Sequence, residues 1–293
     1  MADPTAQVPP PEPPNRDASG SRCNRRGALA ALVAGMGGVT AGGALGYKFR
    51  HRIDGLRAAL GPHRAAPQVR DSPAGGDRDR FNHRAQEIME RHRLQTAESV
   101  AALKDKYEKP AFGKIAVWDL VEKLALCIDT TDGSLCGASQ YLHVQQALAA
   151  MEQAGIDDPN MFLIALLHDL GKVFLLTDEV PENVLCAAGR IGDFAPGVGL
   201  DNVVYQFGHG ELIYSRIKDH LPDAIAWTAR YHNLNISDAE PFMDARDRDY
   251  SERYLKPFRI FDAGFKSQYW TPQVDMARFK DLVHQYFPQP ILF

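Results

Sequence analysis

The sequence has few cysteines and no excess of basic residues, and each shortage excludes a class of protein. Its 293 residues include four cysteines, which form neither a CxxC pair nor a dense framework. A zinc–thiolate site and a disulfide scaffold are therefore not expected. Lys and Arg total 33 against 37 Asp and Glu, a formal net charge of −4. A nucleic-acid-binding protein would show a basic face or stripe, so nucleic acid is not an expected partner.

No alternating apolar pattern of useful strand length follows Phe81, where the periodicity is helical nearly throughout. We therefore predict an all-α fold for residues 79–293, a compact multi-helix bundle preceded by an N-terminal extension, residues 1–78. The helical domain is expected to be monomeric. Turn-forming segments separate eight predicted helices, which cover residues 82–107, 116–127, 141–154, 160–175, 201–219, 223–232, 250–267 and 275–286.

The N-terminal extension contains an uncharged run, residues 27–47, flanked by arginines. Its 21 residues match the length of a membrane-spanning helix, but 13 of them are Gly or Ala, so its hydrophobicity is weak. Three interpretations remain open: a twin-arginine export signal around NRRGAL, a marginal membrane anchor in contact with lipid, or a disordered leader. We expect the helical domain itself to be cytoplasmic, with export or anchoring as the alternatives.

The segment MFLIALLHDLGK, residues 161–172, places His168 and Asp169 directly after seven apolar residues. A helix that is apolar all round is buried. Burying an imidazole next to a carboxylate costs several kcal/mol unless an ion pair or a metal compensates. The two side chains could instead lie at an exposed helix end that Gly171 terminates. The pattern favours a metal site.

Other polar residues on apolar helix faces support the metal site. His143 begins a stripe of small residues on 141–154, and His232 shares the inward face of 223–232. His209 and Asp262 also lie beside apolar residues, on 201–219 and 250–267. A single such histidine is more often a core residue, and Asp262 could simply pair with Lys266. Four histidines on separate helices make coincidence a poor explanation.

Four imidazoles and two carboxylates suit first-row divalent or trivalent metal ions, since no thiolate favours zinc or an iron–sulfur cluster. Six protein ligands are too many for one catalytic metal with an open position. Shared between two metals through a bridging carboxylate, they leave room on each ion. We therefore predict a dinuclear site whose ligands are His143, His168, Asp169, His209, His232 and Asp262.

The order of these residues resembles that of the dinuclear branch of the HD-domain superfamily, and within it the chain is similar to the myo-inositol oxygenase family. The similar segments extend over residues 81–293 and are LLHDLGK at 166–172, GLDNVVYQFGHGELIY at 199–214, RYHN at 230–233, FDAGFK at 261–266 and the closing FPQPILF. HDLGK alone is a weak signal, because dinuclear phosphodiesterases carry a similar string. The spacing from GLD to GH and the final segment are more specific.

The resemblance implies a mixed-valent Fe(II)/Fe(III) oxygenase that uses O2 to cleave the ring of myo-inositol, a small polyol, to D-glucuronate. One iron would take His143, His168, Asp169 and Asp262. The other would take His209 and His232, with Asp169 bridging, and Lys172 would act with Asp169 in catalysis. Substrate contacts would come from Asp129, Thr131, Asp132, Lys172, Asn233 and Lys266. An arginine that covers the substrate would be Arg80 or Arg84.

Two departures from the family lie close to the expected substrate position. The stretch from Asp169 to His209 is some thirty residues shorter than in the animal enzymes, and Asn233 stands where the family usually has Ser. Another polyol or a phosphonate is therefore an alternative substrate of a related di-iron oxygenase. A dinuclear HD-type phosphohydrolase is a further alternative, although the chain lacks a run of Arg and Lys to hold phosphates.

Overall fold

The computed structural model describes residues 75–135 and 137–293, and for residues 75–81 it describes the backbone alone. The apolar run at 27–47 and its flanking arginines lie outside the described residues, as do Cys23 and Cys136. The interpretations of the N-terminal extension therefore stay predictions.

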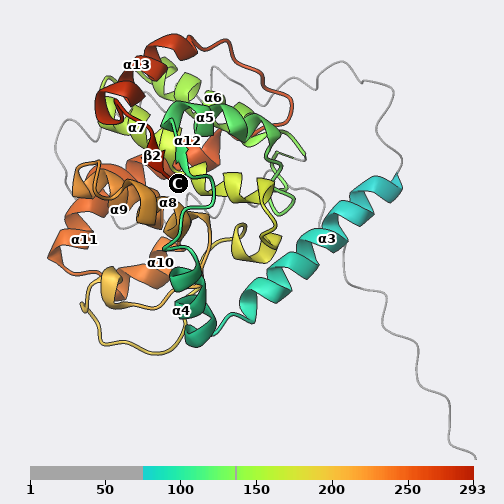
Figure 1. Ribbon diagram of the computed structural model, residues 1–293, viewed down its shortest axis with the longest axis vertical. Coiled ribbons are helices and arrows are strands. Elements are labelled where there is room, and N and C mark those ends of the chain that lie inside the picture. Colours follow the sequence, from blue (N-terminus) through green and yellow to red (C-terminus); the bar gives the residue numbers. More distant parts are fainter. Residues whose placement is uncertain (1–74, 136) are drawn as a thin grey trace, which may run out of the picture. The chain divides into compact units, whose positions relative to one another are not determined.

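The described part is built from helices, which confirms the predicted all-α class (Figure 1). The first half contains, in chain order, α3 (Gly75–Arg93), α4 (Ala97–Lys106), α5 (Val117–Lys123), η1 (Leu124–Leu126), α6 (Gln140–Gln153), α7 (Pro159–Leu167), η2 (Leu170–Leu176) and η3 (Pro181–Asn183). The second half contains η4 (Leu200–Asn202), α8 (His209–Ile217), α9 (Asp223–Tyr231), α10 (Ile236–Ala239), η5 (Glu240–Phe242), α11 (Ala245–Tyr250), the π-helical turn η6 (Ser251–Leu255), α12 (Lys256–Gly264) and α13 (Met276–Tyr286).

Two predicted helices were too long. The helix expected over 82–107 is broken after Arg93, because Thr96 caps α4 in a capping box with Ser99. The helix expected over 201–219 begins only at His209. Residues 203–208 are not helical: Tyr205 forms an isolated bridge with Arg190, and the Gln206 amide donates to the carbonyl of His92 at 2.7 Å. β-branched and aromatic residues in this stretch suit extended backbone.

Further differences concern short elements. The helix expected over 160–175 changes to 3₁₀ geometry after Asp169, so α7 and η2 meet at the His168–Asp169 pair. The short helices between residues 236 and 250 were not predicted, and neither was the antiparallel pairing of β1 (Lys114–Ile115) with β2 (Ile291–Leu292). These elements have one or two helical turns or two paired residues in each strand, too short to produce a periodic pattern.

The core is organised around α7, which packs against α6, α9, α12 and α13. Residues Met161 to Leu167 are all buried, as their apolar character on every face requires. Among the described residues, Pro159–Leu176 is also the stretch long and apolar enough to cross a membrane, but 78% of it is buried inside the protein. We therefore assign it to the core. The helices around it carry the candidate ligands to one place.

Glycines allow α8 to approach its neighbours closely. A Cβ on Gly171 of η2 would lie 2.1 Å from the carbonyl oxygen of His209, and one on Gly210 would lie 2.3 Å from that of Arg230 in α9. Both distances are far inside van der Waals contact, so only glycine fits. The approach brings His209 towards Asp169.

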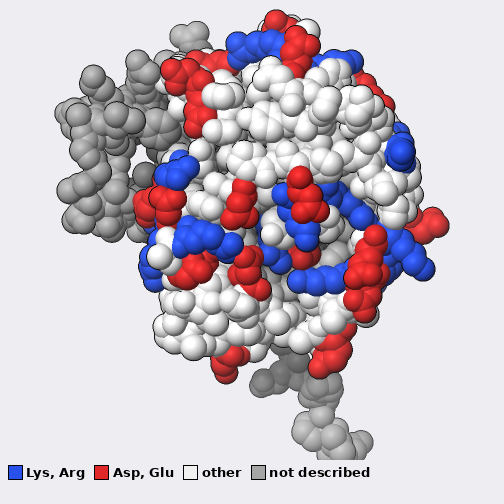
Figure 2. Space-filling view, turned by 60° about the vertical axis from the view of Figure 1, so that its left-hand side comes forward, with Lys and Arg blue, Asp and Glu red and all other residues white. Residues whose placement is uncertain are grey.

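The end of the chain packs into the same core. Phe293 is fully buried, and its ring contacts Phe112 and Phe174 at centroid distances of 6.0 and 5.6 Å. Its backbone N–H donates to Gly113 at 3.0 Å, next to the β1–β2 pair. On the face shown in Figure 2, acidic and basic side chains are interspersed, without a broad area of a single sign.

Candidate metal centre

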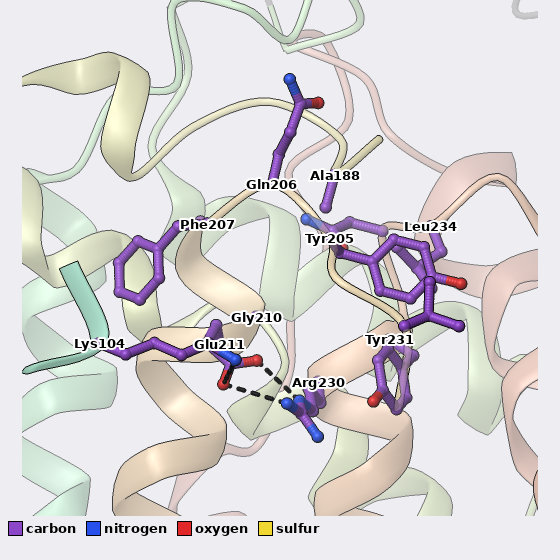
Figure 3. Close-up of a pocket in the computed structure, with 13 residues that line it drawn as sticks. Lys104, Ala188, Tyr205, Gln206, Phe207, Gly210, Glu211, Arg230, Tyr231 and Leu234 are labelled. Carbon is purple, nitrogen blue, oxygen red and sulfur yellow. Dashed lines mark hydrogen bonds and ion pairs between the residues drawn. The ribbon is translucent and has the colours of Figure 1, made fainter. Parts of the chain in front are cut away.

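A small cavity beside α8 and α9 is not the site of chemistry (Figure 3). Its volume is about 20 Å³, room for one water and too little for a sugar-sized ring. Its lining includes Gly208, Gly210 and Asn233, neighbours of His209 and His232 in the chain, but neither histidine. Its walls are held by an ion pair between Arg230 and Glu211, 2.7 Å apart.

The six residues predicted as ligands come together in the core. His143 comes from the second turn of α6, His168 and Asp169 from the junction of α7 with η2, and His209 from the first position of α8. His232 directly follows α9, and Asp262 lies on α12. Each of the six is at most 8% exposed. Their convergence from five helices and across 120 residues of sequence defines the candidate centre.

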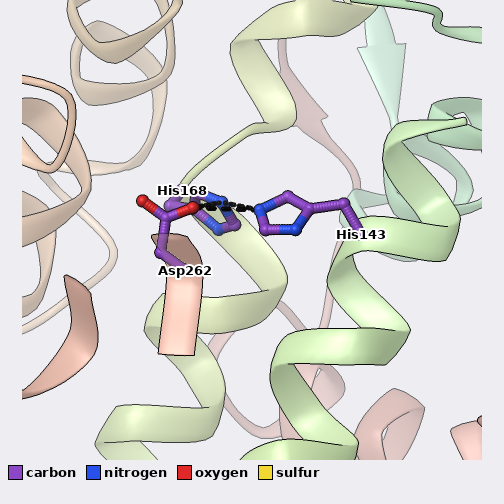
Figure 4. A group of neighbouring side chains, drawn as sticks. All are labelled: His143, His168 and Asp262. Atoms are coloured by element: carbon purple, nitrogen blue, oxygen red, sulfur yellow. Dashed lines mark hydrogen bonds and ion pairs between the residues drawn. The ribbon is translucent and has the colours of Figure 1, made fainter. Parts of the chain in front are cut away.

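The first group of donor atoms contains His143, His168 and Asp262 (Figure 4). The Nε2 atoms of the two histidines are 3.2 Å apart, and His143 Nε2 lies 3.0 Å from Oδ1 of Asp262. Asp169 joins this group through Oδ2, which is 3.1 Å from His168 Nε2. These donor atoms are close enough to share one metal ion.

The second group lies around the other oxygen of Asp169. Its Oδ1 is 3.3 Å from Nε2 of His209 and 3.5 Å from Nε2 of His232. The two histidine nitrogens are 3.2 Å apart. The carboxylate of Asp169 thus presents one oxygen to each group, the geometry that a bridging ligand requires.

Backbone carbonyls orient three of the four imidazoles. Nδ1 lies 3.0 Å from Ala165 O in His168, 2.8 Å from Val184 O in His209 and 2.8 Å from Ala229 O in His232. A carbonyl accepts only from a protonated Nδ1, so each Nε2 presents its lone pair to the centre. Nδ1 of His143 is buried without a hydrogen-bond partner among the described residues.

The electrostatics favour the metal-binding protonation states. Burial, assisted by the nearby Lys266, lowers the pKa of His143 to about 4, and burial also lowers the pKa of His209 and His232. Burial opposes ionisation of Asp169 and Asp262, but nearby histidines and lysines outweigh it and hold both carboxyl pKa values well below their usual range. Neutral imidazole lone pairs that face one another at 3.2 Å repel unless a cation lies between them. The donor set therefore fits two metal ions.

Lys172 is buried and has three partners, Gln140 Oε1 at 3.0 Å, Asp129 Oδ2 at 2.9 Å and Asp169 Oδ2 at 3.2 Å. An ammonium has three N–H donors, so all of them are used. Burial opposes its charge, but the two carboxylates raise the pKa of Lys172 above its usual value. Thr131 donates to the other oxygen of Asp129 from its N–H and its hydroxyl, at 2.8 and 2.6 Å.

Lys266, two residues after the end of α12, makes the equivalent connection. Its Nζ lies 3.1 Å from Asp262 Oδ1 and 3.2 Å from Asp132 Oδ2. Burial opposes its charge, and these two carboxylates outweigh the burial and raise its pKa well above the usual value. The two lysines therefore tie the loop that contains Asp129, Thr131 and Asp132 to the carboxylates of the candidate metal centre.

Of the remaining predicted residues whose side chains are described, one lies beside the candidate metal centre and the other does not. Asn233 lies beside the centre, with Nδ2 3.5 Å from His209 Nε2, and it donates to Cys186 O at 3.2 Å. Arg84 is exposed on α3, and the side chain of Arg80 lies outside the described part. Cys127 and Cys186 are free thiols, and burial raises the pKa of each to about 12, so neither resembles a thiolate ligand.

Two buried glutamines near the centre were not predicted. Gln140 and Gln146 lie three residues before and after His143 on α6 and are fully buried. Gln140 accepts from Lys172, and Gln146 bonds to the backbone after α12. Their spacing from His143 was the available signal, because residues three apart share one face of a helix.

Comparisons with known proteins point to one family. A profile of the family described as "Myo-inositol oxygenase" matches residues 82–186. "Inositol oxygenase 1" of Arabidopsis thaliana is 28% identical over 262 residues, which cover 73% of this chain and 83% of the relative. "Probable inositol oxygenase" of Oryza sativa subsp. japonica is 26% identical over 239 residues, 67% and 76% of the two chains. "Inositol oxygenase" of Bos taurus is 23% identical over 283 residues, 80% of this chain and 98% of the relative.

Proposed function

Because the chain belongs to the myo-inositol oxygenase family, we propose that it is an enzyme that uses O2 and two iron ions to cleave the ring of myo-inositol to D-glucuronate. The observation that carries the proposal is the position of Asp169, whose two oxygens face different pairs of histidines. Two irons, present as Fe(II) and Fe(III), would supply the activation of O2, which protein side chains alone do not provide.

In this proposal His143, His168, Asp169 and Asp262 would hold one iron, and His209, His232 and Asp169 would hold the other. The short distances of His143 and His168 to Asp262 support the first set, and the contacts of Asp169 Oδ1 support the second. With fewer protein ligands, the ion held by His209 and His232 would have more room for a substrate. A vicinal diol of the substrate would bind there.

The charges around the centre favour a neutral polyol over a phosphate or a phosphonate. Lys172 and Lys266 are each paired with two carboxylates, so neither contributes an uncompensated positive charge. A dianionic phosphonate would find neither of these two lysines free to pair with it. Hydroxyl groups of a polyol can instead donate to Asp129 and Asp132 and accept from the ammonium group of Lys266.

The lysines also have a chemical role in this proposal. A lysine N–H donor beside a substrate hydroxyl held at an iron would favour the deprotonated, chelating form of that hydroxyl. Lys172 contacts the bridging Asp169 directly, and Lys266 contacts Asp262. We assign Lys172 to catalysis with Asp169. The substrate would be oriented by the 129–132 loop, Asn233 and Lys266.

The experiment is the oxygen consumption of the purified, iron-loaded and partly reduced full-length chain on addition of myo-inositol. Uptake of one O2 for each glucuronate formed is the expected result. If the chain binds two irons but does not turn over myo-inositol, the proposal that myo-inositol is its substrate is contradicted. Turnover of another polyol or a phosphonate would then identify a related oxygenase. Hydrolysis of a phosphate ester without O2 uptake would overturn the oxygenase proposal.

We propose that the catalytic domain is located in the cytoplasm and that the N-terminal extension neither exports it nor anchors it in a membrane. We also propose that the catalytic domain is monomeric. Cell fractionation of the full-length chain tests this against export and anchoring. Release to the periplasm that stops when Arg25 and Arg26 are both replaced by Lys would support a twin-arginine signal. Recovery with membranes that requires residues 27–47 would support an anchor. Light scattering of the purified chain measures its oligomeric state.

A further inference from the structure

Lys266 lies in a segment whose position secondary structure does not fix. α12 ends at Gly264, and residues 265–275 form neither helix nor strand. Packing of Phe265 against Phe261 and Trp270 keeps the segment near the core, at centroid distances of 6.0 and 6.4 Å. Ring contacts of this kind do not determine where a four-carbon lysine side chain places its ammonium group.

Gln146 supplies the polar contacts that fix this segment. Its side-chain amide donates to the carbonyl oxygens of Ser267 and Trp270, both at 2.5 Å, and its Oε1 accepts from the N–H of Ser267 at 3.1 Å. The same Ser267 oxygen also accepts from the N–H of Trp270, which closes a turn. Two of these three hydrogen bonds hold Ser267, the residue next to Lys266, and the third holds Trp270.

The location of Gln146 connects this segment to the candidate metal centre. The side chain is fully buried and lies one turn after His143 on α6, so the helix that carries His143 also anchors the segment that follows Asp262. Figure 4 shows His143 and Asp262 facing each other from α6 and α12. The spacing between these two helices and the position of Lys266 are therefore fixed by the same residue.

We propose that Gln146 is a positioning residue, which holds Lys266 where its ammonium group bridges Asp262 and Asp132. A glutamine suits this role because it donates twice and accepts once, as the two carbonyls and the N–H require. Glutamate would place a carboxylate against two carbonyl oxygens. The effect on substrate binding rests on the proposed function, whereas the effect on Lys266 itself does not.

The first test measures Lys266 directly and needs no activity. Gln146→Leu keeps the side-chain volume and removes all three hydrogen bonds, and Gln145→Leu makes the same substitution at the adjacent residue of α6. Both are treated in the full-length chain with a limiting amine-acetylating reagent, and each lysine is quantified by mass spectrometry. We expect acetylation of Lys266 to rise about tenfold in Gln146→Leu, relative to exposed Lys280, and to stay unchanged in Gln145→Leu.

Acetylation of Lys172 shows whether Gln146→Leu releases Lys266 alone or loosens the packing of the whole centre. Lys172 is buried near the same centre but has no contact with Gln146. A rise at Lys266 alone, together with faster amide hydrogen exchange at Ser267, supports the proposal. An equal rise at Lys172 and Lys266 would mean that Gln146 only stabilises the fold. Unchanged acetylation of Lys266 would overturn the positioning role.

A double-mutant cycle then tests the consequence for substrate. Gln146→Leu should raise KM for myo-inositol about tenfold while iron per chain is maintained, and it should add little once Lys266 has been replaced by Met. If the fold-increases in KM caused by the two single substitutions multiply in the double mutant, Gln146 does not act through Lys266. If the unmodified chain fails to turn over myo-inositol, the proposed function fails, and the acetylation result still decides the positioning role.

Discussion

Asp169 has the least tolerance for substitution among the candidate ligands, because its two oxygens contact different histidine groups. In Asp169→Asn, one oxygen becomes an N–H donor directed at a ligand nitrogen or a metal, and the negative charge is lost. We expect iron bound at both positions to fall, and turnover to decrease by more than about a hundredfold. Metal analysis per chain and an O2 uptake assay measure both effects.

Asp193→Asn is the matched control, since the Asp193 side chain is fully exposed outside the centre. It should retain the iron content and the activity of the unmodified chain. If Asp169→Asn kept two irons per chain and normal turnover, a bridging role for Asp169 would be excluded.

The six candidate ligands could be predicted because each stands out locally: a charged or imidazole side chain interrupts an apolar face. Gln140 and Gln146 could not be predicted in the same way. A glutamine on a helix is ordinarily solvated, and the partners of Gln146 are more than 120 residues away in the sequence. Their burial depends on how α6 packs against η2 and α12, which one helix does not determine.

At the scale of elements, the close approach of η2 to α8 depends on Gly171. In Gly171→Ala the new methyl group would overlap the backbone of His209, so α8 must move away from Asp169. We expect a loss of about 1–3 kcal/mol in the free energy of unfolding and a selective loss of the iron bound by His209 and His232. Urea unfolding and Mössbauer spectroscopy of iron-57-loaded protein measure the two effects.

Gly264→Ala provides the comparison, because a methyl group there would meet no atom within 4 Å. It should preserve both stability and iron content. Normal iron occupancy in Gly171→Ala would show that the position of α8 does not control the second metal.

The contact of Phe293 with β1 and the aromatic core gives a second prediction for an element. Phe293→Ala removes a fully buried ring between Phe112 and Phe174 and should cost about 3–5 kcal/mol in unfolding free energy. Leu292→Ala changes the adjacent residue, which is 56% exposed, and should alter stability by less than about 0.5 kcal/mol. Equal effects of the two substitutions in urea unfolding would contradict the docking of β2 through Phe293.

The fold could be predicted where one apolar face repeats over more than two turns, as in α6, α9 and α13. It could not be predicted where local hydrogen bonding competes with the helix. Thr96 and Ser99 end one predicted helix by capping the next, a signal that was present in the sequence. The extended residues 203–208 are held by Arg190, Gly189 and His92, partners that only the folded chain provides.

For the whole molecule, the candidate metal centre and the hydrophobic core occupy the same place. α6, α7, α8, α9 and α12 each contribute a ligand or end beside one, so the packing of these helices brings four imidazoles together. Burial lowers the pKa of three of them, His143, His209 and His232. The stability of the iron-free protein should depend on pH for that reason.

The sign of this dependence follows from the lowered histidine pKa values. The unfolded chain binds a proton at His143 near pH 6.5, whereas the folded chain does so only near pH 4, so acid in this interval favours unfolding. The free energy of unfolding keeps its full value above about pH 6.5 and falls towards pH 4. The fall due to His143 alone is about 3 kcal/mol. His209 and His232 shift in the same direction and increase the loss. The lowered carboxyl pKa values of Asp169 and Asp262 act only below about pH 4, since their usual value is 3.8.

Urea unfolding of the iron-free chain at pH 8, 7, 6 and 5 measures this dependence. The free energy should be nearly constant from pH 8 to 7 and should then decrease with each step. His143→Gln, which cannot titrate, should flatten the decrease, whereas His83→Gln, at an exposed position of α3, should leave it unchanged. Stability that stayed constant or increased between pH 7 and 5 would mean that these imidazoles are charged in the folded protein. They would then carry a proton on the nitrogen that metal binding requires.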